Sequence, residues 1–125
     1  MLIDSDILIW QSRGHVGAAE RLFELKTWQI SIVTYIELAQ GSFDKRDLLR
    51  LKKALAQRNT QTFQVTPTIS QRAADLIDQF ALSHGLRLAD ALIAATAIEL
   101  NLTLLTANVK HFKNISELNI EPFVL

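Results

Sequence analysis

Short apolar runs alternate along this chain with segments of helical periodicity, and this alternation limits the fold more than any other feature of the sequence. A strand, a crossing helix and a second, parallel strand form a right-handed unit, and several such units bury both faces of one sheet. We therefore predict an α/β fold, a three-layer α/β/α sandwich with a central parallel sheet of about five strands. The expected strands are residues 1–4, 30–33, 62–65, 102–105 and 120–125.

Helices are expected between these strands wherever apolar residues recur at the helical period. Thr34 is the predicted N-cap of one of them, Gly41 its stop, and Gly85 the C-cap of another. Residues 88–100 are apolar on nearly all sides and should form a core helix. The expected helices are residues 14–26, 35–39, 44–58, 70–84 and 88–100, with a short turn at 109–112.

The composition of the chain limits the number of domains, the possible metal ligands and the cellular compartment that we expect. With 125 residues and 49% hydrophobic content, we expect one domain spanning 1–125. The absence of cysteine leaves carboxylates, amides and three histidines as metal ligands, which favours hard cations such as Mg²⁺. With no long apolar run and no secretory signal pattern at the N-terminus, we expect a cytoplasmic protein without a membrane segment.

Four polar side chains follow or flank the predicted strands. Asp4 ends the first strand, Glu37 follows the second, Asp90 begins the core helix, and Asn108 lies just beyond residues 102–105. In open parallel sheets, ligands bind beyond the carboxyl ends of the strands, so these four can meet at one edge. Clustered carboxylates repel one another unless cations lie between them. Two divalent ions about 4 Å apart in such a cluster can activate water and stabilise the leaving oxygen of a phosphodiester.

Each of these residues also has a purely structural interpretation. Glu37 follows Thr34 by three residues, which is the spacing of a capping box. Asp90 can complement the dipole of its helix, and Asp4 can cap a turn. Asn108 can start a short helix. Both interpretations stay open for every one of them at this stage.

Four segments, taken together and in this order, resemble the PIN-domain nucleases and, within them, the VapC-like toxins of toxin–antitoxin pairs. The segments are LIDSDILIW (2–10), TYIELAQG (34–41), LADALIAATA (88–97) and LLTANVKHF (104–112). The resemblance implies that Asp4, Glu37 and Asp90 are catalytic carboxylates that bind Mg²⁺ or Mn²⁺. Asn108 takes a fourth catalytic position, where many members of the family have an acid and the toxin-like branch often has Asn. An amide brings no negative charge, so three acids remain for the predicted ions.

Four further residues are candidates for supporting roles near this site. Asp6 stands where the family usually has a small polar residue, and the Thr106 hydroxyl is a candidate for holding a phosphate or a metal-bound water. Arg87 is a candidate for binding substrate phosphate, the alternative being a solvated side chain, and His111 is more often structural in such a place. Trp10 can stack on a base, although a core position is the favoured interpretation.

The helix at 44–58 has two features of its own. Its basic residues suit either a nucleic-acid surface or an ordinary solvated face. They are Lys45, Arg46, Arg50, Lys52, Lys53 and Arg58. Its apolar strip, within residues 43–55, suits either a partner helix or burial against the sheet. The balance of thirteen basic and thirteen acidic residues gives no net attraction to a polyanion.

The resemblance implies a metal-dependent endoribonuclease that hydrolyses RNA phosphodiester bonds. It also implies a homodimer and a small antitoxin whose tail enters the active-site groove. Two other functions remain as alternatives. One is an inactive PIN-like module that binds nucleic acid or a partner, and the other is a phosphatase on a similar α/β fold.

Overall fold

The computed structural model describes residues 1–125 and contains a five-stranded sheet in the order β3-β2-β1-β4-β5. Every neighbouring pair of strands is parallel. All five predicted strands are present, and the predicted fold class is confirmed. The strands are β1 (Leu2–Ile3), β2 (Gln29–Ser31), β3 (Gln61–Phe63), β4 (Leu104–Thr106) and β5 (Ile120–Pro122).

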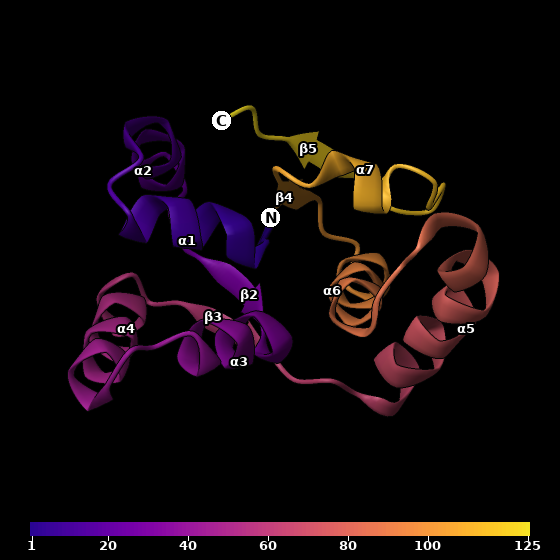
Figure 1. The fold of residues 1–125 in the computed structure, drawn as a ribbon, viewed down its shortest axis with the longest axis horizontal. Helices are drawn as coiled ribbons and strands as arrows, with labels where there is room; N and C mark the ends of the chain where they lie inside the picture. Colours follow the sequence, from indigo (N-terminus) through magenta and orange to yellow (C-terminus); the bar gives the residue numbers. More distant parts are fainter.

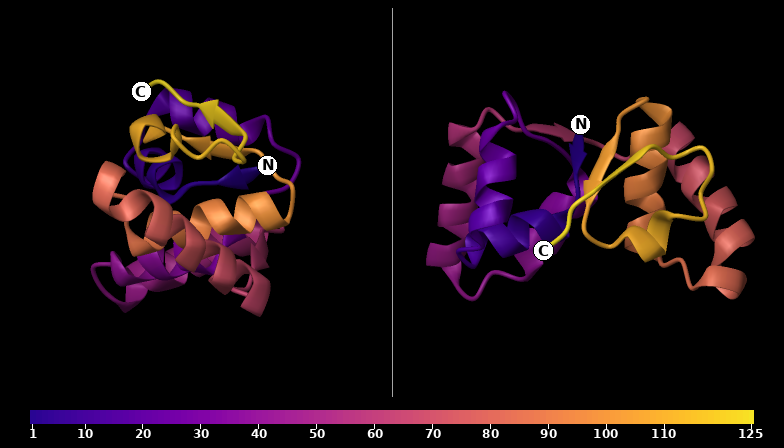
Figure 2. Two further views of the ribbon diagram at one scale, coloured as in Figure 1. Left: turned by 90° about the vertical axis from the view of Figure 1, so that its right-hand side faces the viewer. Right: turned by 90° about the horizontal axis from the view of Figure 1, so that it is seen from above.

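Helices cover both faces of the sheet and give the molecule three layers. Figure 1 shows α1, α2 and α4 on one side of the sheet and α5, α6 and α7 on the other, and the views of Figure 2 agree. Helix α3 contacts both α1 and α6. The helices are α1 (Ser5–Ser12), α2 (Val16–Phe23), α3 (Ile32–Gln40), α4 (Lys45–Gln57), α5 (Pro67–His84), α6 (Leu88–Glu99) and α7 (Val109–Phe112).

Two hydrophobic cores lie on the two faces of the sheet, and the central strands contribute to both. Leu2 and Leu104 belong to the core under α5, α6 and α7, whereas Ile3 and Leu105 belong to the core under α1, α2 and α4. All four are 0% exposed. Successive side chains of a strand point to opposite faces, so an apolar pair in each central strand closes both cores.

Helix α6 confirms the prediction of a helix that is apolar on nearly all sides. Five of its apolar residues are at most 1% exposed, namely Ala91, Ile93, Ala94, Ala95 and Ala97. Because α6 leads back into β4, its first turn lies at the edge where the parallel strands end. No helix of the structure has both the length and the apolar character required to cross a membrane.

Helix α1 was not expected from the sequence. It begins directly after Asp4, whose Oδ1 accepts a hydrogen bond from the backbone N–H of Ser5 at 2.8 Å. Ile7 and Leu8 are buried, but Trp10 stays 37% exposed. The favoured interpretation of Trp10 as a core residue is therefore wrong, because the core-facing positions of this short helix are already taken by Ile7 and Leu8.

Helix α3 begins earlier than predicted, and this changes the interpretation of Glu37. Ser31 is the N-cap, and its hydroxyl accepts a hydrogen bond from the backbone N–H of Val33 at 3.0 Å. The prediction that Thr34 caps the helix is wrong, because Thr34 lies inside it and is 0% exposed. Glu37 is therefore not the partner of Thr34 in a capping box. The predicted stop at Gly41 is confirmed.

Helix α5 also begins earlier than expected, at Pro67. Thr66 is its N-cap, with the hydroxyl accepting a hydrogen bond from the N–H of Ile69 at 3.2 Å. Proline is favoured in the first turn of a helix because its missing N–H would have no partner there. Gly85 ends the helix in the left-handed conformation, at a φ of 68°, and the predicted C-cap is confirmed.

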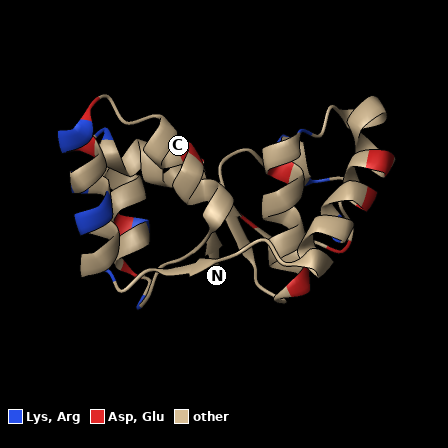
Figure 3. Ribbon diagram, turned by 90° about the horizontal axis from the view of Figure 1, so that it is seen from below, with Lys and Arg blue, Asp and Glu red and all other residues tan.

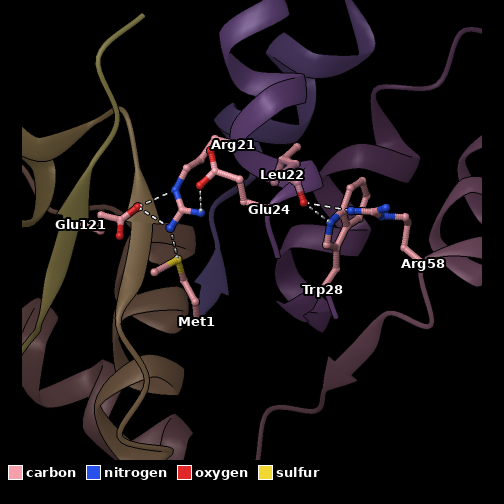
Figure 4. Close-up of polar contacts among 7 residues, drawn as sticks. All are labelled: Met1, Arg21, Leu22, Glu24, Trp28, Arg58 and Glu121. Atoms are coloured by element: carbon pink, nitrogen blue, oxygen red, sulfur yellow. Dashed lines mark hydrogen bonds and ion pairs between the residues drawn. The ribbon is translucent and has the colours of Figure 1, made fainter. Parts of the chain in front are cut away.

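Two polar clusters join α2 to distant parts of the chain (Figure 4). Arg21 Nε donates a hydrogen bond to Glu121 Oε2 at 2.8 Å and so connects α2 with the last strand. The carbonyl of Leu22 accepts hydrogen bonds from Trp28 Nε1 at 3.2 Å and from Arg58 Nη2 at 2.9 Å. The Arg58 guanidinium lies 4.8 Å from the centre of the Trp28 ring. These contacts fix the end of α4 beside α2.

Candidate active site

Asp4 lies at the carboxyl end of β1 and is only 5% exposed. Its Oδ1 caps α1 through Ser5, and its Oδ2 accepts a hydrogen bond from the Thr106 hydroxyl at 2.7 Å. Burial, and then the nearby charge of Asp6, raise the pKa of Asp4 to about 7. Asp4 therefore both caps α1 and lies at the predicted site, and each of its two carboxylate oxygens has its own hydrogen-bond partner.

Asp6 lies in the first turn of α1 and bonds across to the segment after β4. Its Oδ2 accepts a hydrogen bond from the backbone N–H of Ala107 at 3.0 Å and lies 3.5 Å from the Thr106 hydroxyl. Its other oxygen, Oδ1, is buried and has no hydrogen-bond partner. Burial is the main cause that raises the pKa of Asp6.

Glu37 projects from the second half of α3 and is half-buried. Its Oε1 has no hydrogen-bond partner. Burial raises the pKa of Glu37, a hydrogen bond from the Ser5 side chain lowers it, and the charges of Asp90 and Asp6 raise it. Ser5 therefore lies between Asp4 and Glu37, a position that sequence reasoning missed because it predicted no helix at residues 5–12.

Asp90 lies in the first turn of α6, and His111 faces it from α7. His111 Nδ1 is 3.6 Å from Asp90 Oδ2, close enough for an ion pair when the imidazole is protonated. Burial raises the pKa of Asp90. The charge of His111 lowers this pKa, and so do a backbone hydrogen bond from Arg87 and the charge of its side chain. Arg87 itself is exposed just before α6. The structure therefore brings both supporting candidates next to Asp90.

Thr106 is the last residue of β4, and Asn108 is the residue just before α7. Thr106 is 0% exposed, and its hydroxyl accepts a hydrogen bond from the backbone N–H of Asn108 at 3.0 Å while donating to Asp4. Asn108 is exposed and precedes α7, but its side chain makes no capping hydrogen bond. The backbone of Asn108, rather than its amide, is what the structure ties to the acidic cluster.

Four carboxylates, those of Asp4, Asp6, Glu37 and Asp90, thus converge from α1, α3, α6 and the end of β1. Each has a raised pKa, and the charges of Asp6 and Asp90 act on both Asp4 and Glu37. As the side chains stand, no three acidic or histidine residues are arranged to hold one metal ion. The donor set nevertheless fits a hard divalent cation, because two buried carboxylate oxygens have no donor to bond with.

Comparison with known proteins identifies the family. Residues 1–118 match the PIN domain family. This chain belongs to the PIN-domain family. The membership that four sequence segments predicted is therefore confirmed. Ribonuclease VapC10 of Mycobacterium tuberculosis (strain H37Rv) is 37% identical to this PIN domain over 131 residues, which cover 100% of this chain and 94% of the relative.

Solved structures agree with this assignment of the PIN fold. A chain of a toxin–antitoxin complex from Klebsiella pneumoniae superposes with a TM-score of 0.83 at 28% identity, covering 99% of this chain and 98% of that one. A chain of VapBC-1 from nontypeable Haemophilus influenzae gives a TM-score of 0.80 at 25% identity, with coverage of 97% and 96%. The similarity extends over nearly the whole of each chain.

A groove of about 550 Å³ in this PIN domain lies between α1, α3 and α4 and includes Glu37 in its wall. Part of the predicted apolar strip lines it, since Leu51 and Leu55 face the groove, whereas Phe43 is 92% exposed. Arg13 and Arg50 also line it. The groove therefore joins an apolar surface and two basic side chains to the acidic cluster.

The basic residues of α4 lie mostly on its outer surface. Figure 3 shows Lys and Arg segments gathered on this helix, at the opposite end of the molecule from the acidic segments of α5. Arg58 is the exception, since it follows the helix and packs over Trp28. The exposed ones are Lys45, Arg46, Arg50, Lys52 and Lys53.

Proposed function

We propose that this chain is a metal-dependent endoribonuclease and the toxin of a toxin–antitoxin pair, with residues 1–125 forming a single nuclease domain that acts in the cytoplasm. The observation that carries the proposal is the approach of Asp4, Glu37 and Asp90 to one another at the carboxyl edge of a PIN-type sheet, with Glu37 Oε1 left without a hydrogen-bond partner. Its 37% identity to a ribonuclease over the whole chain supports RNA as the substrate.

Asp4, Glu37 and Asp90 are the residues that would hold Mg²⁺ or Mn²⁺. A divalent cation bound there would supply Lewis-acid activation of water and neutralise charge on the phosphodiester. The Thr106 hydroxyl orients the Asp4 carboxylate through its 2.7 Å hydrogen bond. Arg87, exposed beside Asp90, binds a substrate phosphate oxygen, and His111 holds the Asp90 carboxylate in place.

An antitoxin and a second copy of the chain are the proposed protein partners. The groove between α1, α3 and α4 supports the first, because it offers an apolar lining that leads to Glu37. A partner segment lying there would cover one wall of the acidic cluster and block substrate. Structural similarity to a chain of a toxin–antitoxin complex, at 28% identity, supports the same assignment. A homodimer completes the proposal.

RNA cleavage by purified protein tests the function. Wild type should cleave single-stranded RNA in Mg²⁺ or Mn²⁺ and stop in excess chelator. Asp90→Asn should reduce the rate by more than the roughly 10–100-fold that changes in outer-shell residues cause, since it removes a ligand. Asp78→Asn is the matched control, because Asp78 is exposed on α5 and its side chain forms no hydrogen bond or ion pair. Cleavage that persists in saturating chelator would disprove the metal mechanism.

Two other outcomes correspond to the alternative functions. A protein that binds RNA but leaves it intact in every metal would be an inactive binding module, which the neutral, exposed amide of Asn108 makes worth testing. Hydrolysis of a small phosphomonoester in place of RNA would indicate a phosphatase. Both assays use the same wild-type preparation as the cleavage experiment.

A further inference from the structure

Asp6 differs from a purely structural acid, because only one of its two carboxylate oxygens has a hydrogen-bond partner. It lies on α1, and its Oδ2 accepts a hydrogen bond from the backbone N–H of Ala107 at 3.0 Å. The same Oδ2 lies 3.5 Å from the Thr106 hydroxyl. This oxygen therefore has a clear role, which is to hold the turn after β4 against the start of α1.

The other oxygen of Asp6 has no such partner. Oδ1 is buried and has no hydrogen-bond partner, and Asp6 forms no ion pair, although the backbone N–H groups of Ile7 and Asn108 are close enough to the carboxylate to lower its pKa. Leaving a buried charged oxygen without a donor is costly, and natural proteins rarely do so without a ligand or ion to occupy it. The surrounding groups make the cost larger, because the charge of Asp6 acts on Asp4 and Glu37, both of which are acidic.

Asn108, by contrast, gives the cluster little. Its side chain is exposed and carries no charge, and its contribution is the backbone N–H that bonds to the Thr106 hydroxyl at 3.0 Å. Asp6 accepts a hydrogen bond from the N–H of Ala107, the residue just before Asn108, so a charge absent at Asn108 is present a short distance away at Asp6.

We propose that Asp6 is the fourth carboxylate of the metal site and takes the charge-bearing role that Asn108 cannot fill. Its Oδ2 fixes the turn from Thr106 to Asn108, and its Oδ1 provides the negative charge and the free oxygen for the divalent cation. The inference rests on the proposed function, because it adds a ligand to the same site. The free protein then presents four acids to the cation in place of the three that the sequence indicated.

Calorimetric titration of Mn²⁺ into the full chain, without RNA, distinguishes charge from structure at this position. Asp6→Asn keeps an oxygen that can accept the Ala107 N–H but removes the charge. Asp6→Glu keeps the charge but lengthens the side chain and disturbs that hydrogen bond. The proposal predicts that Asp6→Asn weakens Mn²⁺ binding at least about tenfold and that Asp6→Glu weakens it less. Asp78→Asn, the control on the exposed surface of α5, should change the affinity by less than about threefold.

The opposite order of the two Asp6 variants would overturn the proposal, as would a wild-type affinity in Asp6→Asn. Circular dichroism and the melting temperature of each variant, measured without metal, check that the fold is kept. If Asp6→Asn fails to fold, Asp6→Ser takes its place, because serine also removes the charge, and a wild-type Mn²⁺ affinity in that variant would overturn the proposal. Asp90→Asn separates this inference from the proposed function. If Asp90→Asn binds Mn²⁺ as well as wild type does, the proposed metal site itself is wrong. If Asp90→Asn loses Mn²⁺ affinity and Asp6→Asn does not, only the role of Asp6 is refuted.

Discussion

The two oxygens of Asp4 perform different tasks, and this side chain determines how the metal-free protein responds to pH. One oxygen caps α1 and the other accepts the Thr106 hydroxyl, so the carboxylate is fixed in a buried position. Burial and the charge of Asp6 raise its pKa to about 7, against an ordinary value of 3.8. The folded state therefore holds a proton that the unfolded chain releases well below neutral pH.

The sign of the resulting pH dependence follows from linkage. The folded state binds more protons than the unfolded state between these two pKa values, so stability falls as pH rises through that window. We expect the metal-free protein to lose on the order of 1–3 kcal/mol between about pH 5 and pH 8. Asp4→Asn should flatten this dependence. Thermal melts of both proteins in chelator measure it, and a wild-type melting temperature that rises over this range would contradict the raised pKa.

Glu37 can now be tested without the complication of a capping role. Because Ser31 caps α3, Glu37→Gln should leave the melting temperature of the metal-free protein unchanged or slightly higher. Its Mn²⁺ affinity should fall at least about tenfold, since a neutral amide replaces a ligand. Calorimetric titration measures the affinity, with Glu20→Gln as a control on the exposed surface of α2. Equal affinity in wild type and Glu37→Gln would refute ligation.

At the scale of elements, the start of α3 is the point where local pattern and structure disagree. A polar residue before an apolar helical segment favours a cap, and both Ser31 and Thr34 meet that description. Tertiary packing selects Ser31, because β2 ends there and Thr34 points into the interior with its Oγ1 unpaired. The buried hydroxyl of Thr34 therefore contributes no stabilising hydrogen bond.

This arrangement predicts opposite effects for two substitutions. Ser31→Ala should destabilise the protein by about 1 kcal/mol through loss of the cap. Thr34→Val should change stability by less than about 0.5 kcal/mol or raise it, because an unpaired buried hydroxyl is replaced by a methyl group of similar size. Urea denaturation of both variants measures the two effects. A large loss in Thr34→Val with no loss in Ser31→Ala would restore Thr34 as the cap.

The long helices could be predicted from sequence, whereas the short helix α1 beside the site could not. Gly85 as a C-cap and the apolar α6 depend on local preference and on a pattern of twelve residues. Helix α1 has only eight residues, and apolar and polar side chains follow no helical period in it. Its existence depends on the Asp4 cap and on packing of Ile7 and Leu8, which local sequence does not reveal.

The same limit applies to the acidic cluster. Asp4, Glu37 and Asp90 could be placed at one edge because each follows from the order of strands and helices. Ser5 lies between two of these acids only because residues 5–12 are helical. The contact of Asp6 with Ala107 joins positions 101 residues apart, and no periodicity predicts such a contact.

At the scale of the whole molecule, the parallel sheet explains why these acids meet. Strands β1 and β4 are neighbours and end together, which puts Asp4 beside the turn after Thr106. The helices that return the chain begin or end at the same edge, so Glu37 and Asp90 reach it from α3 and α6. The folded chain thus holds several carboxylates close together, and a divalent cation relieves their repulsion.

The most direct measurement of this central claim is the melting temperature of the wild-type protein at about pH 8 with and without Mn²⁺. At 100 times the dissociation constant, binding should add about 2.7 kcal/mol and raise the melting temperature by roughly 8–13 °C. Asp78→Asn should show the same rise, and Asp90→Asn should show little of it. No rise in wild type, or an equal rise in Asp90→Asn, would contradict the account of the acidic cluster as a cation site.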